Sequence, residues 1–113
     1  MDKTQIILET VKKALEDKKA TEIKMLHVEK ITVMADYFVI ASGSNRNQLQ
    51  AIVDEIDAEL GKQQIEPKYI EGRQSNSWIL MDYGTVIIHI FDEENREFYN
   101  LDKIWSDATS VTL

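Results

Sequence analysis

Two apolar runs joined by a short polar turn, WILMDYGTVIIHIF at residues 78–91, constrain the fold of this chain more than any other segment. Alternating and β-branched residues on either side of a turn that contains Gly84 predict a β-hairpin. A two-residue turn at Tyr83-Gly84 would place Trp78 opposite His89, and a longer turn would change this register. The segment therefore predicts two neighbouring antiparallel strands.

The two faces of the predicted hairpin differ in composition. One face carries only aliphatic side chains and is expected to lie in the core: Ile79, Met81, Val86, Ile88 and Ile90. The other face, called the mixed face below, carries Trp78, Leu80, Asp82, Thr85, Ile87, His89 and Phe91. Large uncovered patches of this kind are uncommon on monomers, so the C-terminal segment, a second copy or a partner must cover the mixed face.

The rest of the chain predicts an α/β fold, a mixed five-stranded sheet with two helices on one face. Apolar residues at helical spacing predict helices over residues 2–18 and from about Asn45 to Gly61. Further strands are predicted in ATEIKMLHV, DYFVIASG and KYIEG. Short helical segments are expected after Asp92. Residues 1–113 are expected to form a single domain, with a loose tail at residues 109–113.

Charge and composition limit the class of partner. The net charge of −7 argues against direct binding of nucleic acid, because such binding depends on Lys and Arg that displace phosphate counterions. An acidic chain suits a basic partner. No apolar run approaches the roughly 20 residues of a membrane span, and the N-terminus lacks the apolar core of a signal peptide. A cytoplasmic protein without a membrane partner is therefore expected.

Catalytic residues are not indicated by any motif. The SGSN segment at residues 42–45 follows a predicted strand and opens a helix, where a phosphate can bind. Nucleotidyltransferases also need two carboxylates one residue apart on the next strand to hold magnesium, and that pair is missing. His27 and His89 are the only histidines and the chain has no cysteine, so no metal site is indicated. No enzyme activity and no cofactor is predicted.

Four segments in order resemble the Iojap family, also called ribosomal silencing factors: DYFVIASGSNRNQLQAI, Glu71-Gly72, WILMDYGTVIIHIF and REFYNLDKIW. The resemblance extends from about Thr4 to Ala108. It implies a nucleotidyltransferase-like fold without the catalytic acids. It also implies a translational repressor that binds the large ribosomal subunit through ribosomal protein number fourteen and hinders joining of the small subunit.

The predicted partner-binding residues come from this resemblance and from the mixed face. The resemblance implies such roles for Glu71, Trp78, Asp82, Tyr83, Gly84 and His89, and Leu80 and Phe91 are added because they share the mixed face. Thr85 departs from the family pattern, in which an acidic residue usually follows the glycine. A tryptophan on a partly apolar face rimmed by acids is typical of a binding hot spot.

Two alternatives stay open at this point. One is a nucleotidyltransferase-like enzyme or phosphate-ester hydrolase that uses Ser42, Ser44 and scattered acids. The other is a regulatory homodimer without a ribosomal role, in which the mixed face binds only a second copy. Because an incompletely covered apolar face is costly, weak homodimer formation is also expected.

Overall fold

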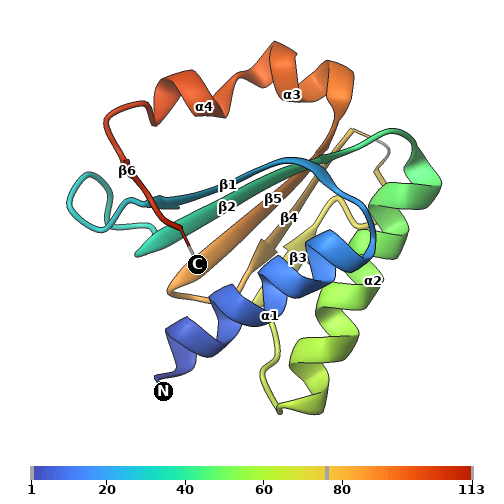
Figure 1. The fold of residues 1–113 in the computed structure, drawn as a ribbon, viewed down its shortest axis with the longest axis horizontal. Coiled ribbons are helices and arrows are strands. Elements are labelled where there is room, and N and C mark those ends of the chain that lie inside the picture. The colour runs from blue at the N-terminus through green and yellow to red at the C-terminus, as the bar shows by residue number, and fades with distance from the viewer. Residues whose placement is uncertain (1, 76, 113) are drawn as a thin grey trace.

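The computed structural model describes residues 2–75 and 77–112 and shows a single mixed sheet with helices on both faces (Figure 1). The helices are α1 (Lys3–Asp17), α2 (Arg46–Lys62), α3 (Glu93–Tyr99) and α4 (Leu101–Ile104). The strands are β1 (Thr21–His27), β2 (Tyr37–Gly43), β3 (Tyr69–Glu71), β4 (Trp78–Asp82), β5 (Val86–Asp92) and β6 (Thr109–Ser110). Their order across the sheet is β3-β4-β5-β2-β1-β6, and β2 and β5 pair in parallel.

The two long helices lie together on one face of the sheet, as predicted (Figure 1). Each begins at a side-chain cap: Asp2 accepts a hydrogen bond from the Gln5 backbone N–H at 2.8 Å, and Asn45 accepts one from that of Gln48 at 2.9 Å. Their apolar stripes pack against the aliphatic face of the hairpin, and the fully buried residues include Ile7, Val11, Leu15, Leu49, Ile52, Ile56, Ile79, Met81, Ile88 and Ile90. No helix among the described residues is long and apolar enough to cross a membrane.

The hairpin register differs from the predicted one. The Tyr83 N–H donates to the Val86 carbonyl at 2.9 Å, so the two-residue turn is Gly84-Thr85, with Gly84 at φ +88°. Trp78 pairs with Phe91 instead of His89, a shift of two residues. Side chains alternate with a period of two, so this even shift leaves the residues of β4 and β5 on their predicted faces. Thr85, predicted on the mixed face, instead lies in the turn, where its hydroxyl hydrogen-bonds with that of Thr4 of α1 at 2.8 Å.

The predicted count of five strands was wrong, because the sheet contains six. Thr109–Ser110, expected in a loose tail, form β6 and pair with His27 and Leu26 of β1. The Val111 N–H also donates to the Met25 carbonyl at 2.8 Å. The returning chain thereby satisfies backbone groups on the open edge of β1. Residue 113 of the predicted tail lies outside the described residues.

The C-terminal segment covers part of the mixed face (Figure 1). Asp92 caps α3 by accepting from the Asn95 N–H at 2.7 Å, and the chain then crosses the sheet. Trp105 packs edge-on against Phe38 of β2, with ring centroids 5.1 Å apart. The buried Arg96 donates to Ser42 Oγ of β2 at 2.8 Å. These contacts hold the C-terminal segment over β2, whereas Trp78 and Leu80 on β4 remain partly exposed. The nucleotidyltransferase-like character implied by the resemblance stays a prediction.

Candidate functional site

The eight predicted partner-binding residues divide into surface and buried groups. Glu71 is exposed, and Trp78, Leu80, Asp82 and Gly84 are partly exposed. Tyr83, His89 and Phe91 are buried, with 6%, 5% and 0% of their surface exposed. These three side chains are therefore not accessible at the surface of the free protein, and their partner-binding role stays a prediction. Phe91 and His89 lie under the aromatic side chains and helices of the mixed face, and Tyr83 turns into the core beneath α1 and α2.

The surface residues meet at a pocket at the edge of the sheet. Glu71, Gly72, Trp78 and Leu80 line a cavity of about 270 Å³, called the edge pocket below. Glu71 of β3 pairs directly with Leu80 of β4, so the two side chains are neighbours in the sheet. Gly72 has φ +68°, and an added Cβ would lie 2.6 Å from the Trp78 carbonyl oxygen. Only glycine allows this close approach, which sets the shape of the pocket.

Trp78 is held by two buried aromatic residues. Its ring stacks on Phe91 with centroids 5.0 Å apart, and its Nε1–H donates to His89 Nδ1 at 3.2 Å. Burial lowers the pKa of His89 to about 4, so the imidazole is neutral near pH 7. Because Nδ1 accepts, the proton sits on Nε2, which has no hydrogen-bond partner among the described residues. His89 therefore acts on the surface through Trp78, by fixing the indole orientation.

Substitution of His89 is expected to release the Trp78 indole. His89→Leu removes the acceptor, whereas His89→Asn keeps an oxygen near the position of Nδ1. We expect the Trp78 indole N–H resonance to shift upfield and exchange faster with solvent in the leucine variant, and much less in the asparagine variant. The loss of a buried hydrogen bond should also cost about 1–3 kcal/mol of stability. An unchanged indole resonance in His89→Leu would contradict the positioning role.

The lowered pKa of His89 makes the stability of the protein depend on pH. The folded-state pKa of about 4 lies below the ordinary value of 6.5, so between these values the unfolded state binds more protons. The contribution of neutral His89 is complete above pH 6.5 and is lost as the pH falls towards 4, a change on the order of 3 kcal/mol. Urea denaturation across this range should show a shallower loss of stability for His89→Asn than for the wild type.

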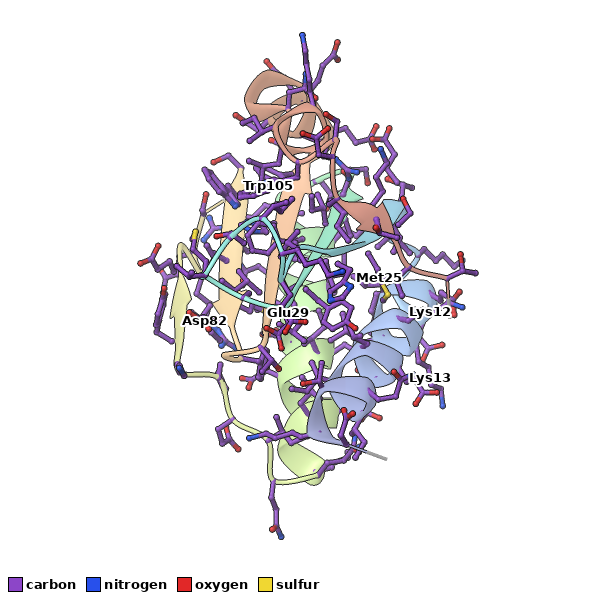
Figure 2. All side chains as sticks on the ribbon, turned by 90° about the vertical axis from the view of Figure 1, so that its left-hand side faces the viewer. Lys12, Lys13, Met25, Glu29, Asp82 and Trp105 are labelled. Carbon is purple, nitrogen blue, oxygen red and sulfur yellow. The ribbon has the colours of Figure 1, made fainter. Side chains whose placement is uncertain are left out.

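The turn end of the hairpin is organised by Asp82, labelled in Figure 2. Its carboxylate accepts from the Gly84 N–H at 2.7 Å, which closes the turn. A hydrogen bond from the exposed Tyr69 hydroxyl to Asp82 raises the pKa of Tyr69. Tyr83 points the other way: burial raises the pKa of its phenol, and its hydroxyl has no hydrogen-bond partner among the described residues. The Asp82 carboxylate therefore stabilises the turn, and the residue is only partly exposed.

The SGSN segment has structural roles in the described part of the chain. Ser42 is buried and accepts from Arg96, and the Ser44 N–H and hydroxyl both donate to Gln48 Oε1, at 2.6 and 2.9 Å. Gln48 in turn donates to the Lys18 and Lys19 carbonyls, which ties the start of α2 to the end of α1. Within residues 2–75 and 77–112, no group of three His, Cys, Asp or Glu side chains is arranged to hold a metal ion.

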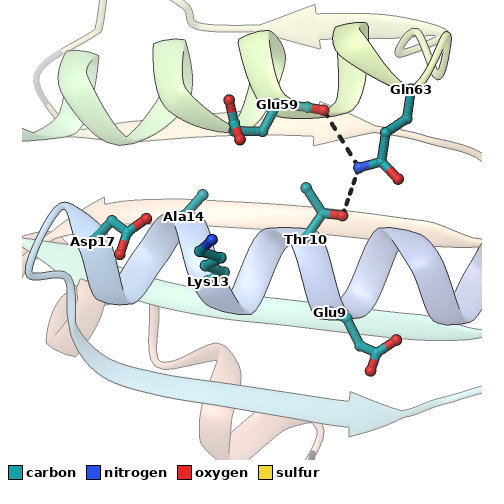
Figure 3. Close-up of a pocket in the computed structure, with 7 residues that line it drawn as sticks. All are labelled: Glu9, Thr10, Lys13, Ala14, Asp17, Glu59 and Gln63. Atoms are coloured by element: carbon teal, nitrogen blue, oxygen red, sulfur yellow. Dashed lines mark hydrogen bonds between the residues drawn. The ribbon is translucent and has the colours of Figure 1, made fainter.

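A second hollow lies on the opposite side of the sheet, between α1 and α2 (Figure 3). It measures about 400 Å³ and is lined by Glu9, Thr10, Lys13, Ala14, Asp17, Glu59 and Gln63. Gln63 Nε2 bridges it by donating to Thr10 Oγ1 at 2.9 Å and to the Glu59 carbonyl at 3.4 Å. Its lining is polar and of both charges, and it contains none of the predicted partner-binding residues.

Known proteins with similar sequences include ribosomal silencing factors and Iojap proteins. The family model described as "Ribosomal silencing factor during starvation" matches residues 1–113. The ribosomal silencing factor RsfS of Halalkalibacterium halodurans is 38% identical over 109 residues, which cover 96% of this chain and 93% of that protein. The chloroplastic protein Iojap of Zea mays is 33% identical over 101 residues, which cover 89% of this chain and 44% of that protein.

Two solved structures have the same fold. A crystal structure from Bacillus halodurans matches with a TM-score of 0.84 and 36% identity, covering 96% of this chain and 99% of that chain. A crystal structure from Chromobacterium violaceum matches with a TM-score of 0.86 and 27% identity, covering 90% of this chain and 85% of that chain.

Proposed function

The chain belongs to the ribosomal silencing factor family, and from this premise we propose that it represses translation by binding the large ribosomal subunit. In the finer form of the proposal, it binds ribosomal protein number fourteen and sterically hinders joining of the small subunit. One observation carries the choice of surface: the C-terminal helices leave Trp78 and Leu80 partly exposed beside the exposed Glu71.

The chemistry of this surface suits a basic protein. The Trp78 indole and Leu80 supply apolar contact area, and Glu71 and Asp82 place carboxylates beside it. The whole chain carries a net charge of −7. Complementary charge steers association and fixes orientation, while a central tryptophan supplies much of the binding energy. A basic ribosomal protein with an apolar recess meets both requirements.

Repression of this kind requires bulk and no chemical step. The described chain measures 34 × 32 × 23 Å along its principal axes. A body of this size, bound where two ribosomal subunits meet, holds their surfaces apart. The proposal therefore does not depend on the SGSN serines, which are engaged in hydrogen bonds to Arg96 and Gln48.

Sedimentation with purified ribosomal subunits tests the proposal. We expect the protein to co-sediment with the large subunit and not with the small subunit, and to reduce the yield of joined ribosomes when added first. Titration with isolated ribosomal protein number fourteen tests the finer form. Binding to the large subunit without binding to that protein would leave the repressor role but reject the partner. Co-sedimentation with neither subunit would reject both.

The remaining alternatives have their own measurements. Weak homodimer formation through the mixed face stays a prediction, and a strict monomer in sedimentation equilibrium at high concentration would count against it. A magnesium-dependent turnover of nucleotides by the pure protein would instead support the enzyme hypothesis. Location in the cytoplasm also stays a prediction.

A further inference from the structure

The connection between β1 and β2, residues 28–36, holds apolar side chains out in solvent. Ile31, Val33 and Met34 are 45%, 105% and 62% exposed. The described residues contain only two other large apolar side chains of comparable exposure, Tyr69 and Ile104. Three such side chains lie within four residues of the chain, and exposed apolar side chains gathered in this way are typical of an interaction site.

Backbone hydrogen bonds give this loop a defined shape. The Val28 N–H donates to the Asp36 carbonyl at 2.8 Å, and the Ile31 and Thr32 N–H groups both donate to the Val28 carbonyl at 3.0 Å. The Met34 N–H donates to Thr32 Oγ1 at 3.1 Å. Val28 and Ala35, at the base of the loop, are buried in the same apolar cluster as Phe38. The loop is therefore preformed, and little ordering entropy opposes its binding to a partner.

The loop is continuous with the proposed ribosome-binding surface. The Asp36 and Tyr37 N–H groups both donate to the Thr85 carbonyl, at 2.9 and 3.0 Å. Thr85 belongs to the hairpin turn that Asp82 closes through Gly84. Figure 2 views the molecule from this end, where the loop faces the reader and where Glu29 and Asp82 are labelled. A partner that covers Trp78, Leu80 and Asp82 along β4 therefore reaches the loop next.

We infer that Ile31, Val33 and Met34 form a second anchor of the same docking surface and insert into an apolar recess of the ribosomal partner. This inference rests on the proposed function. Glu29 and Asp36 flank the apolar residues, and Lys30 is the one basic residue within residues 29–36. The complementary surface on the partner is therefore an apolar recess with basic groups at its rim.

A second copy of the chain fits the loop less well. Stable interfaces between proteins bury at least about 1,000 Å², of which three side chains supply only a fraction. The loop alone is too small to hold a dimer. As an extension of a surface already centred on Trp78, it adds apolar contact without having to provide a complete interface.

Binding of the purified large subunit by loop variants tests the inference. We expect Val33→Ser/Met34→Ser to weaken binding at least about tenfold, because exposed anchors of an interface typically contribute this much together. The melting temperature should stay that of the wild type, since both side chains are exposed in the free protein. The control is Ile104→Ser, which removes a side chain of 65% exposure from α4. It should bind like the wild type.

A shape-matched pair, Val33→Thr/Met34→Gln, guards against a change in loop conformation and should weaken binding in the same direction. Wild-type affinity in both double variants would overturn the inference while leaving the proposed function intact. Loss of self-association with unchanged subunit binding would assign the loop to a second copy and also overturn it. If the wild type itself fails to bind the large subunit, the proposed function and this inference fall together.

Discussion

Replacing Phe91 by alanine is expected to lower the free energy of unfolding by about 3–5 kcal/mol, the usual cost of truncating a buried phenylalanine. Phe91 has no exposed surface and stacks on Trp78. It packs in the same cluster as Phe38, Ile40 and Ile87, so its removal leaves a cavity between the sheet and the C-terminal cover. Urea denaturation followed by circular dichroism measures the loss.

The outcome separates a core residue from a contact residue. A domain of this size has a total stability of about 5–15 kcal/mol, so the alanine variant should unfold at a clearly lower urea concentration. Phe91→Leu, which keeps most of the apolar volume, should lose considerably less. An alanine variant with wild-type stability and impaired subunit binding would return Phe91 to the partner surface, to which its place on the mixed face first assigned it.

The division of the hairpin into two faces could be predicted because it depends only on alternation. Trp78 pairs with Phe91 and not with His89, yet the side chains of β4 and β5 kept their predicted faces, since the register shifted by an even number of residues. The two long helices were predictable for a similar reason. Apolar residues recur at helical spacing over several turns, and Asp2 and Asn45 cap their first turns.

The elements that decide which residues are exposed could not be predicted from such patterns. Strand β6 has two residues, too short for any periodicity, and it forms because the chain returns past the open edge of β1. The burial of His89 and Phe91 depends on α3 and α4 crossing the mixed face, a tertiary arrangement with no local signal. The exposure of the apolar residues in the loop after β1 could likewise not be predicted, because the exposure of a residue depends on its position in the fold and not on local composition.

Trp78→Ala is expected to weaken binding to the large ribosomal subunit by about thirtyfold or more, equivalent to about 2 kcal/mol. The indole lines the edge pocket and is partly exposed, so it can contact a partner directly. Trp78 also stacks on Phe91 and donates to His89, so some loss of stability accompanies the loss of binding.

The second tryptophan separates these two effects. Trp105 packs edge-on against Phe38 under the C-terminal cover, and it does not line the edge pocket. Trp105→Ala should therefore lower the melting temperature while leaving the affinity for the large subunit within a few-fold of the wild type. If Trp78→Ala binds much more weakly than Trp105→Ala at a temperature where both are fully folded, the Trp78 indole is an anchor of the interface. Equal affinities in the two variants would remove Trp78 from the binding surface and leave it a purely structural residue of the mixed face.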